Sequence, residues 1–81
     1  MKIAIVTWDD AYITPIDISF EDACELQPLT RVTVGFLVER RENAIVLATD
    51  HYESDGMWLH SPIVIPIDML KEIKILEEDS L

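Results

Sequence analysis

The sequence predicts a mainly β domain with one short helix, and the clearest evidence lies between residues 32 and 48. Apolar and polar side chains alternate over Val32–Val38, which is the period of a strand with one buried face. A charged turn of four or five residues then leads to Ala44–Ala48, which is apolar at every position. These two runs predict a hairpin whose second arm is covered on both sides. In the first arm, the side chains expected to face the core are Val32, Val34, Phe36 and Val38.

The first strand is predicted for residues 2–8, which are apolar at nearly every position. Asp9 and Asp10 follow it and indicate a turn into a loop rather than paired carboxylates for acid–base chemistry. The isoleucine-rich segment 13–18 is then expected to form a second extended piece. It contains Pro15, which cannot donate a hydrogen bond to a ladder, so we expect it at the edge of a sheet.

A short helix is predicted for residues 19–26. Ser19 is a suitable N-cap, and acids at positions 21 and 22 lie in the first turn, where they interact favourably with the helix dipole. The helix is expected to end before Pro28, because a residue that precedes proline disfavours the helical conformation.

The second half of the chain is predicted to contain a tight turn followed by further strands. Ser54-Asp55-Gly56 is a turn sequence in which the glycine can supply a positive φ, so a strand is expected to begin at Met57. Pro62 separates that strand from Ile63–Ile65 and indicates a bend or an edge position.

Residues 66–70 are predicted to form one helical turn, and residues 71–76 the last strand. Apolar and charged side chains alternate in this last segment, which favours the strand. A helix beginning at Asp68 is the alternative, because apolar residues also recur there at helical spacing. Residues 1–76 are thus expected to form a single domain, and residues 77–81 an acidic, solvated tail.

The composition restricts the kinds of partner that the chain can have. It carries 16 acidic and 6 basic side chains, with a formal net charge of −10. Binding to a phosphate backbone requires Lys and Arg to displace condensed counterions, so we expect no binding to duplex DNA. Apolar residues make up 49% of the chain, which is more than one small core covers, and this excess predicts a homo-oligomer.

The location is expected to be the cytoplasm. The single cysteine, Cys24, cannot form an internal disulfide and is expected to be a small core residue in a reducing compartment. The first residues reach charged positions too soon for a secretory signal, and no segment is long enough to span a membrane. We therefore expect no membrane partner.

Five short motifs occur together along the chain: Trp8-Asp9, Thr33-Val-Gly-Phe-Leu-Val38, Ile45-Val-Leu-Ala48, Ile65-Pro66 and Ile73-Lys-Ile-Leu76. In combination they resemble a family of short uncharacterised proteins from tailed phages and marine viral sequence, and the likeness covers most of the chain. Members look like Sm-like, or SH3-like, small barrels. The resemblance implies about five strongly bent antiparallel strands, a helical turn before the last one, edge strands that pair between subunits to close a ring, and a host cytoplasm as the location. Gly35 supports a bent strand independently, because a sharp bend needs a residue without Cβ.

The RNA-binding motifs of Sm proteins are only partly present. Their first motif places an acid six positions and an asparagine ten positions after the strand glycine, where this chain has Arg41 and Ile45. Asp50, fifteen positions after Gly35, matches the closing acid, whereas Ile65-Pro66 replaces the Arg-Gly of the second motif. The resemblance therefore implies the scaffold without the RNA readout.

The residues expected to bind a ligand are three rings in the second half and two arginines at the hairpin tip: Tyr52, Trp58, His60, Arg40 and Arg41. Rings at a strand edge can stack on a base or anchor a partner, while arginines can contact an anion or an acidic patch of a neighbouring subunit. Burial in the core or in a subunit interface is the alternative for the aromatic residues.

No metal site or catalytic centre is predicted. His51 and His60 flank a turn without the spacing of a zinc site, and Asp50, Glu53 and Asp55 lack the ligand spacing of a calcium loop. The sequence contains no nucleophile elbow or phosphate loop. We therefore expect no metal, no cofactor and no enzymatic activity.

The sequence thus predicts a non-enzymatic, phage-type Sm-like protein that acts as a homo-oligomeric binding or scaffold module with an unidentified ligand. One alternative is a ring that binds RNA or single-stranded nucleic acid. A second is a viral sponge that sequesters a host nucleotide signal between subunits. A third is an inhibitor of a host protein whose acidic face mimics nucleic acid.

Overall fold

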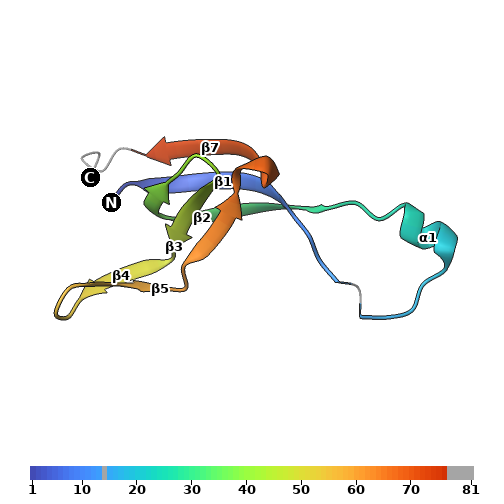
Figure 1. The fold of residues 1–81 in the computed structure, drawn as a ribbon, viewed down its shortest axis with the longest axis horizontal. Coiled ribbons are helices and arrows are strands. Elements are labelled where there is room, and N and C mark those ends of the chain that lie inside the picture. Colours follow the sequence, from blue (N-terminus) through green and yellow to red (C-terminus); the bar gives the residue numbers. More distant parts are fainter. Residues whose placement is uncertain (14, 77–81) are drawn as a thin grey trace.

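The computed structural model describes residues 1–13 and 15–76, and this part of the chain is mainly β with one short α-helix (Figure 1). The strands are β1 (Ile3–Asp10), β2 (Leu29–Arg40), β3 (Ala44–Ala48), β4 (Asp50–Glu53), β5 (Met57–His60), β6 (Ile63–Pro66) and β7 (Leu70–Leu76). The helix α1 spans Phe20–Cys24, and a single 3-10 turn, η1, spans Ile67–Met69. The predicted mainly β class with a small antiparallel sheet is confirmed.

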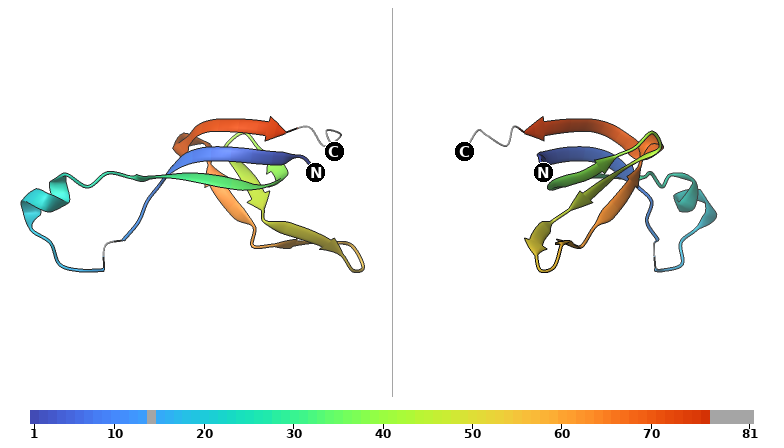
Figure 2. Two further views of the ribbon diagram at one scale, coloured as in Figure 1. Left: turned by 180° about the vertical axis from the view of Figure 1, so that it is seen from behind. Right: turned by 60° about the vertical axis from the view of Figure 1, so that its left-hand side comes forward.

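Five strands form one antiparallel sheet in the order β6-β3-β2-β1-β7, while β4 and β5 form a separate hairpin. β2 is the strand that bends the sheet. Its first part, Leu29–Phe36, pairs with β1, and its last part, from Phe36 to Arg40, pairs with β3. Figure 2 shows β2 and its neighbours curving through this change of partner. The sheet remains open, because β6 and β7 are the two ends of the strand order.

Gly35 lies in β2 immediately before the residue at which β2 changes partner. It is buried, and a Cβ placed on it would lie 2.7 Å from the carbonyl oxygen of Ala48 in the adjacent strand. That oxygen belongs to the backbone of a paired strand, so it cannot move aside cheaply. The prediction that this position requires a residue without Cβ is therefore confirmed.

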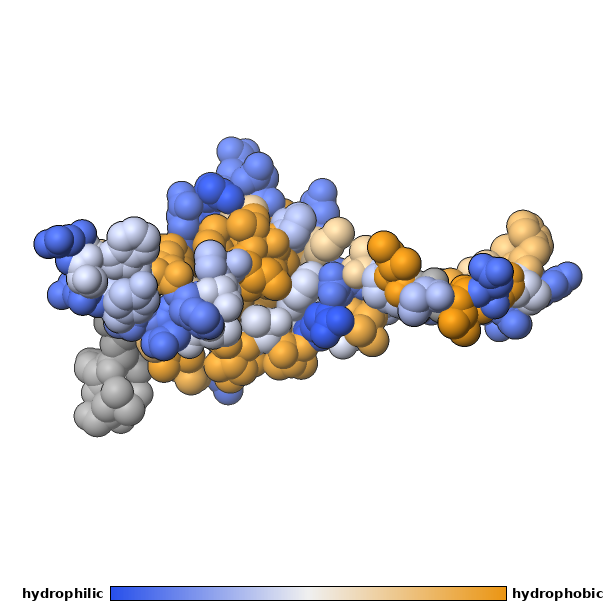
Figure 3. All heavy atoms as spheres, turned by 90° about the horizontal axis from the view of Figure 1, so that it is seen from below, coloured by the Kyte–Doolittle hydropathy of each residue, from blue (hydrophilic) through white to orange (hydrophobic). Residues whose placement is uncertain are grey.

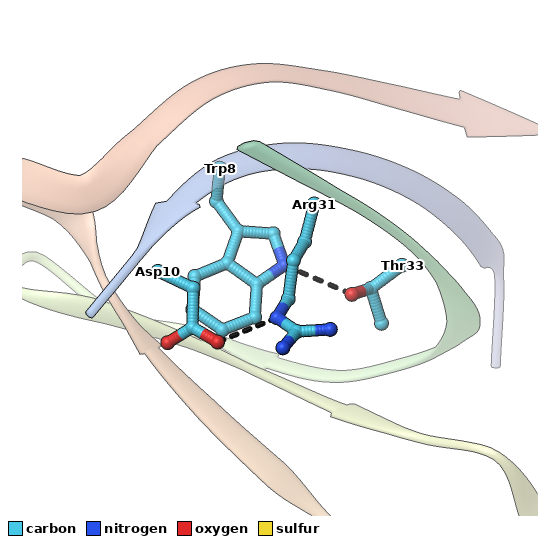
Figure 4. Close-up of polar contacts among 4 residues, drawn as sticks. All are labelled: Trp8, Asp10, Arg31 and Thr33. Atoms are coloured by element: carbon cyan, nitrogen blue, oxygen red, sulfur yellow. Dashed lines mark hydrogen bonds and ion pairs between the residues drawn. The ribbon is translucent and has the colours of Figure 1, made fainter. Parts of the chain in front are cut away.

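The core lies on the concave side of the bent sheet. Its buried side chains are Ala4, Val6, Trp8, Ile45, Leu47 and Ile65. Half-buried residues of β6, η1 and β7 pack around them, so the last third of the chain covers this side. Figure 4 shows how β1 and β2 are tied at the rim of the core, where the indole Nε1 of Trp8 donates to Thr33 Oγ1 at 2.9 Å.

The prediction that Val32, Val34, Phe36 and Val38 form the core face of β2 is wrong. In the register with β1, buried Ala4 and Val6 lie opposite Gly35 and Thr33, so these small residues face the core. Val34 is opposite Ile5 and is 56% exposed. The reason is steric: the concave side of a sharply bent strand has room for Gly and Thr, and the valines are left on the outer side.

Asp9 and Asp10 do not form a loop entry, contrary to the sequence-based prediction. They continue β1, opposite Thr30 and Leu29 of β2. Neighbouring strands supply partners for both carboxylates: Thr30 Oγ1 donates to Asp9 at 3.1 Å, and Arg31 Nε pairs with Asp10 at 2.5 Å (Figure 4). These contacts extend the β1–β2 ribbon by two residues beyond Trp8.

The segment between β1 and β2 leaves the sheet as a long projection, here called the arm (residues 11–13 and 15–28; right in Figure 1). The predicted helix is present, and the side chain of Ser19 accepts a hydrogen bond from the Asp22 backbone N–H at 3.1 Å, as expected for an N-cap. The expected edge strand at residues 13–18 is absent from the described part of the arm, because no strand runs beside it to supply a ladder. Cys24 is exposed rather than a core residue, since α1 has no buried residue.

The elements expected in the second half are confirmed. β3 is buried at four of its five positions, β6 is an edge strand after the bend at Pro62, and η1 and β7 follow as one helical turn and a strand. The alternative helix from Asp68 is excluded, because Leu70–Leu76 pairs with β1. The predicted tail at 77–81 lies outside the described residues.

Candidate binding surface on the second hairpin

The hairpin of β4 and β5 projects from the body of the molecule (lower left in Figure 1). Asp55 and Gly56 turn the chain with φ values of 54° and 111°, and the Ser54 N–H donates to the Gly56 carbonyl oxygen at 2.9 Å. The predicted Ser-Asp-Gly turn is therefore present, and it fixes the register of the two strands. Asp50 is paired with His60, and Tyr52 with Trp58.

Because side chains alternate across a strand, this register separates the hairpin into two faces. One face carries Asp50, Tyr52, Trp58 and His60, and is here called the aromatic face. His51 lies on the opposite face and contacts the Phe36 ring edge to face, with centroids 4.6 Å apart. That contact turns the opposite face toward the body of the molecule, so the aromatic face points outward.

Tyr52 and Trp58 are the main feature of the aromatic face. Each is 55% exposed, although side chains of this size are mostly buried in small domains. The indole is held in place, because Trp58 Nε1 donates to the carbonyl oxygen of Ser54 at 2.8 Å. Tyr52 and Trp58 are directly paired across the two strands, so both rings lie on one solvent-facing surface.

The structure brings three of the predicted binding residues together, Tyr52, Trp58 and His60. It also adds Asp50, which the sequence analysis matched to the closing acid of an Sm motif and did not predict as a binding residue. One carboxylate oxygen of Asp50 accepts the His51 backbone N–H at 2.8 Å, which orients the side chain. The pairing of Asp50 with His60 follows from a three-residue loop, residues 54–56, centred on Asp55.

Arg40 and Arg41 are not part of this surface. They lie at the end of β2 and in the following turn, which packs against η1 through a hydrogen bond from the Ile67 N–H to the Asn43 carbonyl oxygen at 2.9 Å. Arg41 pairs with Glu39 at 3.4 Å and lines an open depression with acidic neighbours. The arginines and the aromatic pair are therefore separate features.

The local charge of the hairpin is negative. Residues 50–60 contain Asp50, Glu53 and Asp55 but no Lys or Arg. The aromatic face can therefore stack on a flat ring or attract a cation, but offers no positive charge to a phosphate.

The two histidines do not converge on a common point. His51 and His60 are on opposite faces of the hairpin, because their strand partners are Leu59 and Asp50 respectively. Within residues 1–13 and 15–76, no group of three or more His, Cys, Asp or Glu side chains is arranged to hold a metal ion.

Comparisons with protein-family models, curated proteins and solved structures found no match to this chain. Among the helices of the described residues, none has the length and apolar character needed to cross a membrane. The site is therefore interpreted from its own geometry.

Proposed function

We propose that this protein is a non-enzymatic binding module of the phage type, built on an Sm-like small barrel and assembled as a homo-oligomer. The observation that carries the proposal is the outward-facing pair Tyr52 and Trp58 on a projecting hairpin, with the indole held by its hydrogen bond to Ser54 and both rings 55% exposed. Exposed aromatic pairs of this kind are typical of surfaces that bind a partner.

The barrel part of the proposal rests on topology. The five-stranded antiparallel sheet, bent where β2 changes partner, and the single helical turn η1 before the last strand agree with features that the family resemblance implies. Gly35 supports it further, since its close approach to Ala48 is what a strongly bent strand requires.

Assembly is supported by the ends of the sheet. Among the described strands, β6 and β7 each pair with one neighbour, so the outer edge of each offers backbone donors and acceptors to a second chain. Val64 in β6 is 56% exposed and adds apolar surface beside that edge. Pairing of such edges between subunits would close a ring, as the resemblance implies.

The ligand class that the aromatic face fits best is an unpaired base, in single-stranded nucleic acid or in a nucleotide. Tyr52 and Trp58 supply stacking surface, and the carboxylate of Asp50 can accept hydrogen bonds from base N–H groups. With no Lys or Arg in the hairpin, the phosphates contribute little, and binding to duplex DNA is not expected. A pocket between subunits for a host nucleotide signal would use the same rings.

A second candidate function follows from the acidic residues around the rings. A basic segment of another protein would be attracted by Asp50, Glu53 and Asp55 and could place a cation over Trp58. The acidic hairpin would then stand in for nucleic acid and inhibit a nucleic-acid-binding protein of the host.

Titration calorimetry separates these candidates. The purified protein is titrated with short single-stranded oligonucleotides, with mononucleotides and cyclic dinucleotides, with duplex DNA, and with Arg-rich peptides. Stacking contributes about 1–3 kcal/mol per base, so Trp58→Ala should weaken base binding roughly 5- to 150-fold. Met57→Ala is the matched control, because Met57 is 53% exposed on the opposite face of the hairpin and should leave binding unchanged.

Salt dependence gives the second readout. Binding by stacking should change little between low and high salt, whereas binding to Arg-rich peptides should weaken as salt screens the carboxylates. Tight, salt-sensitive binding to duplex DNA would contradict the proposal. It would mean that Arg31, Arg40 and Arg41 form a basic surface across subunits.

A further inference from the structure

Within residues 1–13 and 15–76, two apolar surfaces are left uncovered, and the first is the arm. Its exposed large apolar residues are Tyr12, Ile13, Ile16, Ile18, Phe20 and Leu26. Ile13 is 90% exposed and Phe20 81% exposed, and the helix α1 has no buried residue. Such exposure is unusual for large apolar side chains. Figure 3 shows hydrophobic residues along much of the projection.

The second surface is the outer face of the sheet, opposite the core. Here Ile5 of β1 lies between Val34 of β2 and Lys74 of β7, and the neighbouring row places Val32 beside Thr7. Val32 is 64% exposed and Val34 56% exposed. No element among the described residues covers this face, and Ile5, Val32 and Val34 form an apolar patch on it.

We propose that the arm of one copy lies on the outer sheet face of a second copy, with the exchange made reciprocally about a twofold axis. The proposal rests on the homo-oligomeric part of the function given above and names a contact other than the strand edges. The described molecule measures 51 × 26 × 25 Å, with the arm extending along the long axis away from its own sheet (Figure 2). The arm is therefore placed to reach a neighbour rather than to fold over its own face.

The apolar area exposed on the arm is close to the area that each partner buries in a specific protein–protein interface. The exposed fractions of the six arm residues amount to nearly four full side chains, or roughly 600–800 Å² at about 150–200 Å² per large side chain. Specific interfaces bury about 800 Å² on each partner. A reciprocal exchange uses the arm and the outer face of both copies, so each partner reaches that size.

Charge complementarity supports contact between the arm and the β7 side of the outer face. Within the arm, Asp17, Glu21, Asp22 and Glu25 are the charged side chains, and all are negative. The β7 side of the outer face carries Lys74 beside Glu72, and Lys71, whose ammonium lies 3.6 Å from a carboxylate oxygen of Asp9 in β1. The acidic arm thus meets the part of the sheet that is richest in lysine.

The test uses one variant of each surface and light scattering at micromolar concentration. Ile16→Ser/Phe20→Ser alters the arm, and Val34→Glu alters the outer face; none of these side chains contributes to the core. Each variant should have a lower mass than the wild-type protein. Met57→Glu, at a similarly exposed apolar position on the hairpin, should retain the wild-type mass.

Mixing the two variants gives the decisive measurement. The arm variant keeps its outer face and the face variant keeps its arm, so an equimolar mixture can form one intact contact and should regain mass. In the wild-type protein, a thiol-to-amine crosslinker anchored on Cys24 should join Lys71 or Lys74 of another copy.

Three outcomes would overturn the proposal. If the arm variant keeps the wild-type mass, the arm contact is wrong while the proposed self-assembly stands. If the mixture regains no mass, the arm and the outer face are not each other's partners. A monomeric wild-type protein would overturn both this contact and the homo-oligomer.

Discussion

Replacing Gly35 by alanine is the most direct test of the bent sheet. The new Cβ would lie 2.7 Å from the Ala48 carbonyl oxygen and 3.3 Å from its carbonyl carbon. Both atoms are backbone atoms of β3, which is held on its other side by pairing to β6. The contact can be relieved only by moving β3 away from β2, at the point where the two strands begin to pair.

The cost can be estimated from overpacking. Extra methyl groups in packed cores cost about 1–3 kcal/mol, and a rigid backbone neighbour places Gly35→Ala near the upper end. For a domain of this size, each kcal/mol lowers the melting midpoint by about 4–8 °C, so we expect a fall of roughly 10–20 °C. Gly35→Val adds two further methyl groups at the same place and should prevent folding.

Gly56→Ala is the control for this measurement. Gly56 has a positive φ of 111°, but a Cβ there would meet nothing within 4 Å. Its cost is therefore conformational, about 1–2 kcal/mol, and falls on a hairpin outside the core. The comparison uses circular dichroism melts at one fixed protein concentration, because the proposed assembly would make the midpoint depend on concentration. If Gly35→Ala melts within a few degrees of the parent, or no lower than Gly56→Ala, β2 does not bend against β3 as described.

Three further substitutions test other parts of the fold. Trp8→Phe should lose about 1–2 kcal/mol, because it removes the hydrogen bond to Thr33 and leaves a small void; an unchanged urea midpoint would contradict that contact. Arg31→Met should cost less than about 1 kcal/mol, since its ion pair with Asp10 is exposed, and a larger loss in the same assay would mean that the pair is buried in the assembly. Ser19→Ala should remove the cap of α1 and speed hydrogen exchange at the Asp22 amide, and an unchanged exchange rate would show that the cap does not hold the helix.

Much of the fold could be predicted because the signals are local. The Ser-Asp-Gly turn requires a positive φ at glycine, and the structure has one at Gly56. Ser19 offers its hydroxyl to the first helical turn, and alternating apolar residues after Pro66 give the last strand. In each case, residues within a few positions of one another decide the conformation.

The candidate site was predictable in part. Tyr52, Trp58 and His60 share a face because one turn fixes their register, which is again a local effect. Arg40 and Arg41 could not be placed relative to them, because that depends on how far β2 bends before the chain reaches the hairpin. Sequence spacing gives no measure of that angle.

The misassigned face of β2 follows from two expectations that exclude each other. Gly35 was expected at a sharp bend, where the missing side chain is needed on the concave side, and the neighbouring valines were expected to face the core. Because side chains alternate along a strand, Gly35 and Val34 cannot both face the same side. The close approach of Gly35 to Ala48 decides between them and places Val32 and Val34 outside. The outer face that carries Val32 and Val34 is therefore the surface that we propose is covered by the arm of a second copy.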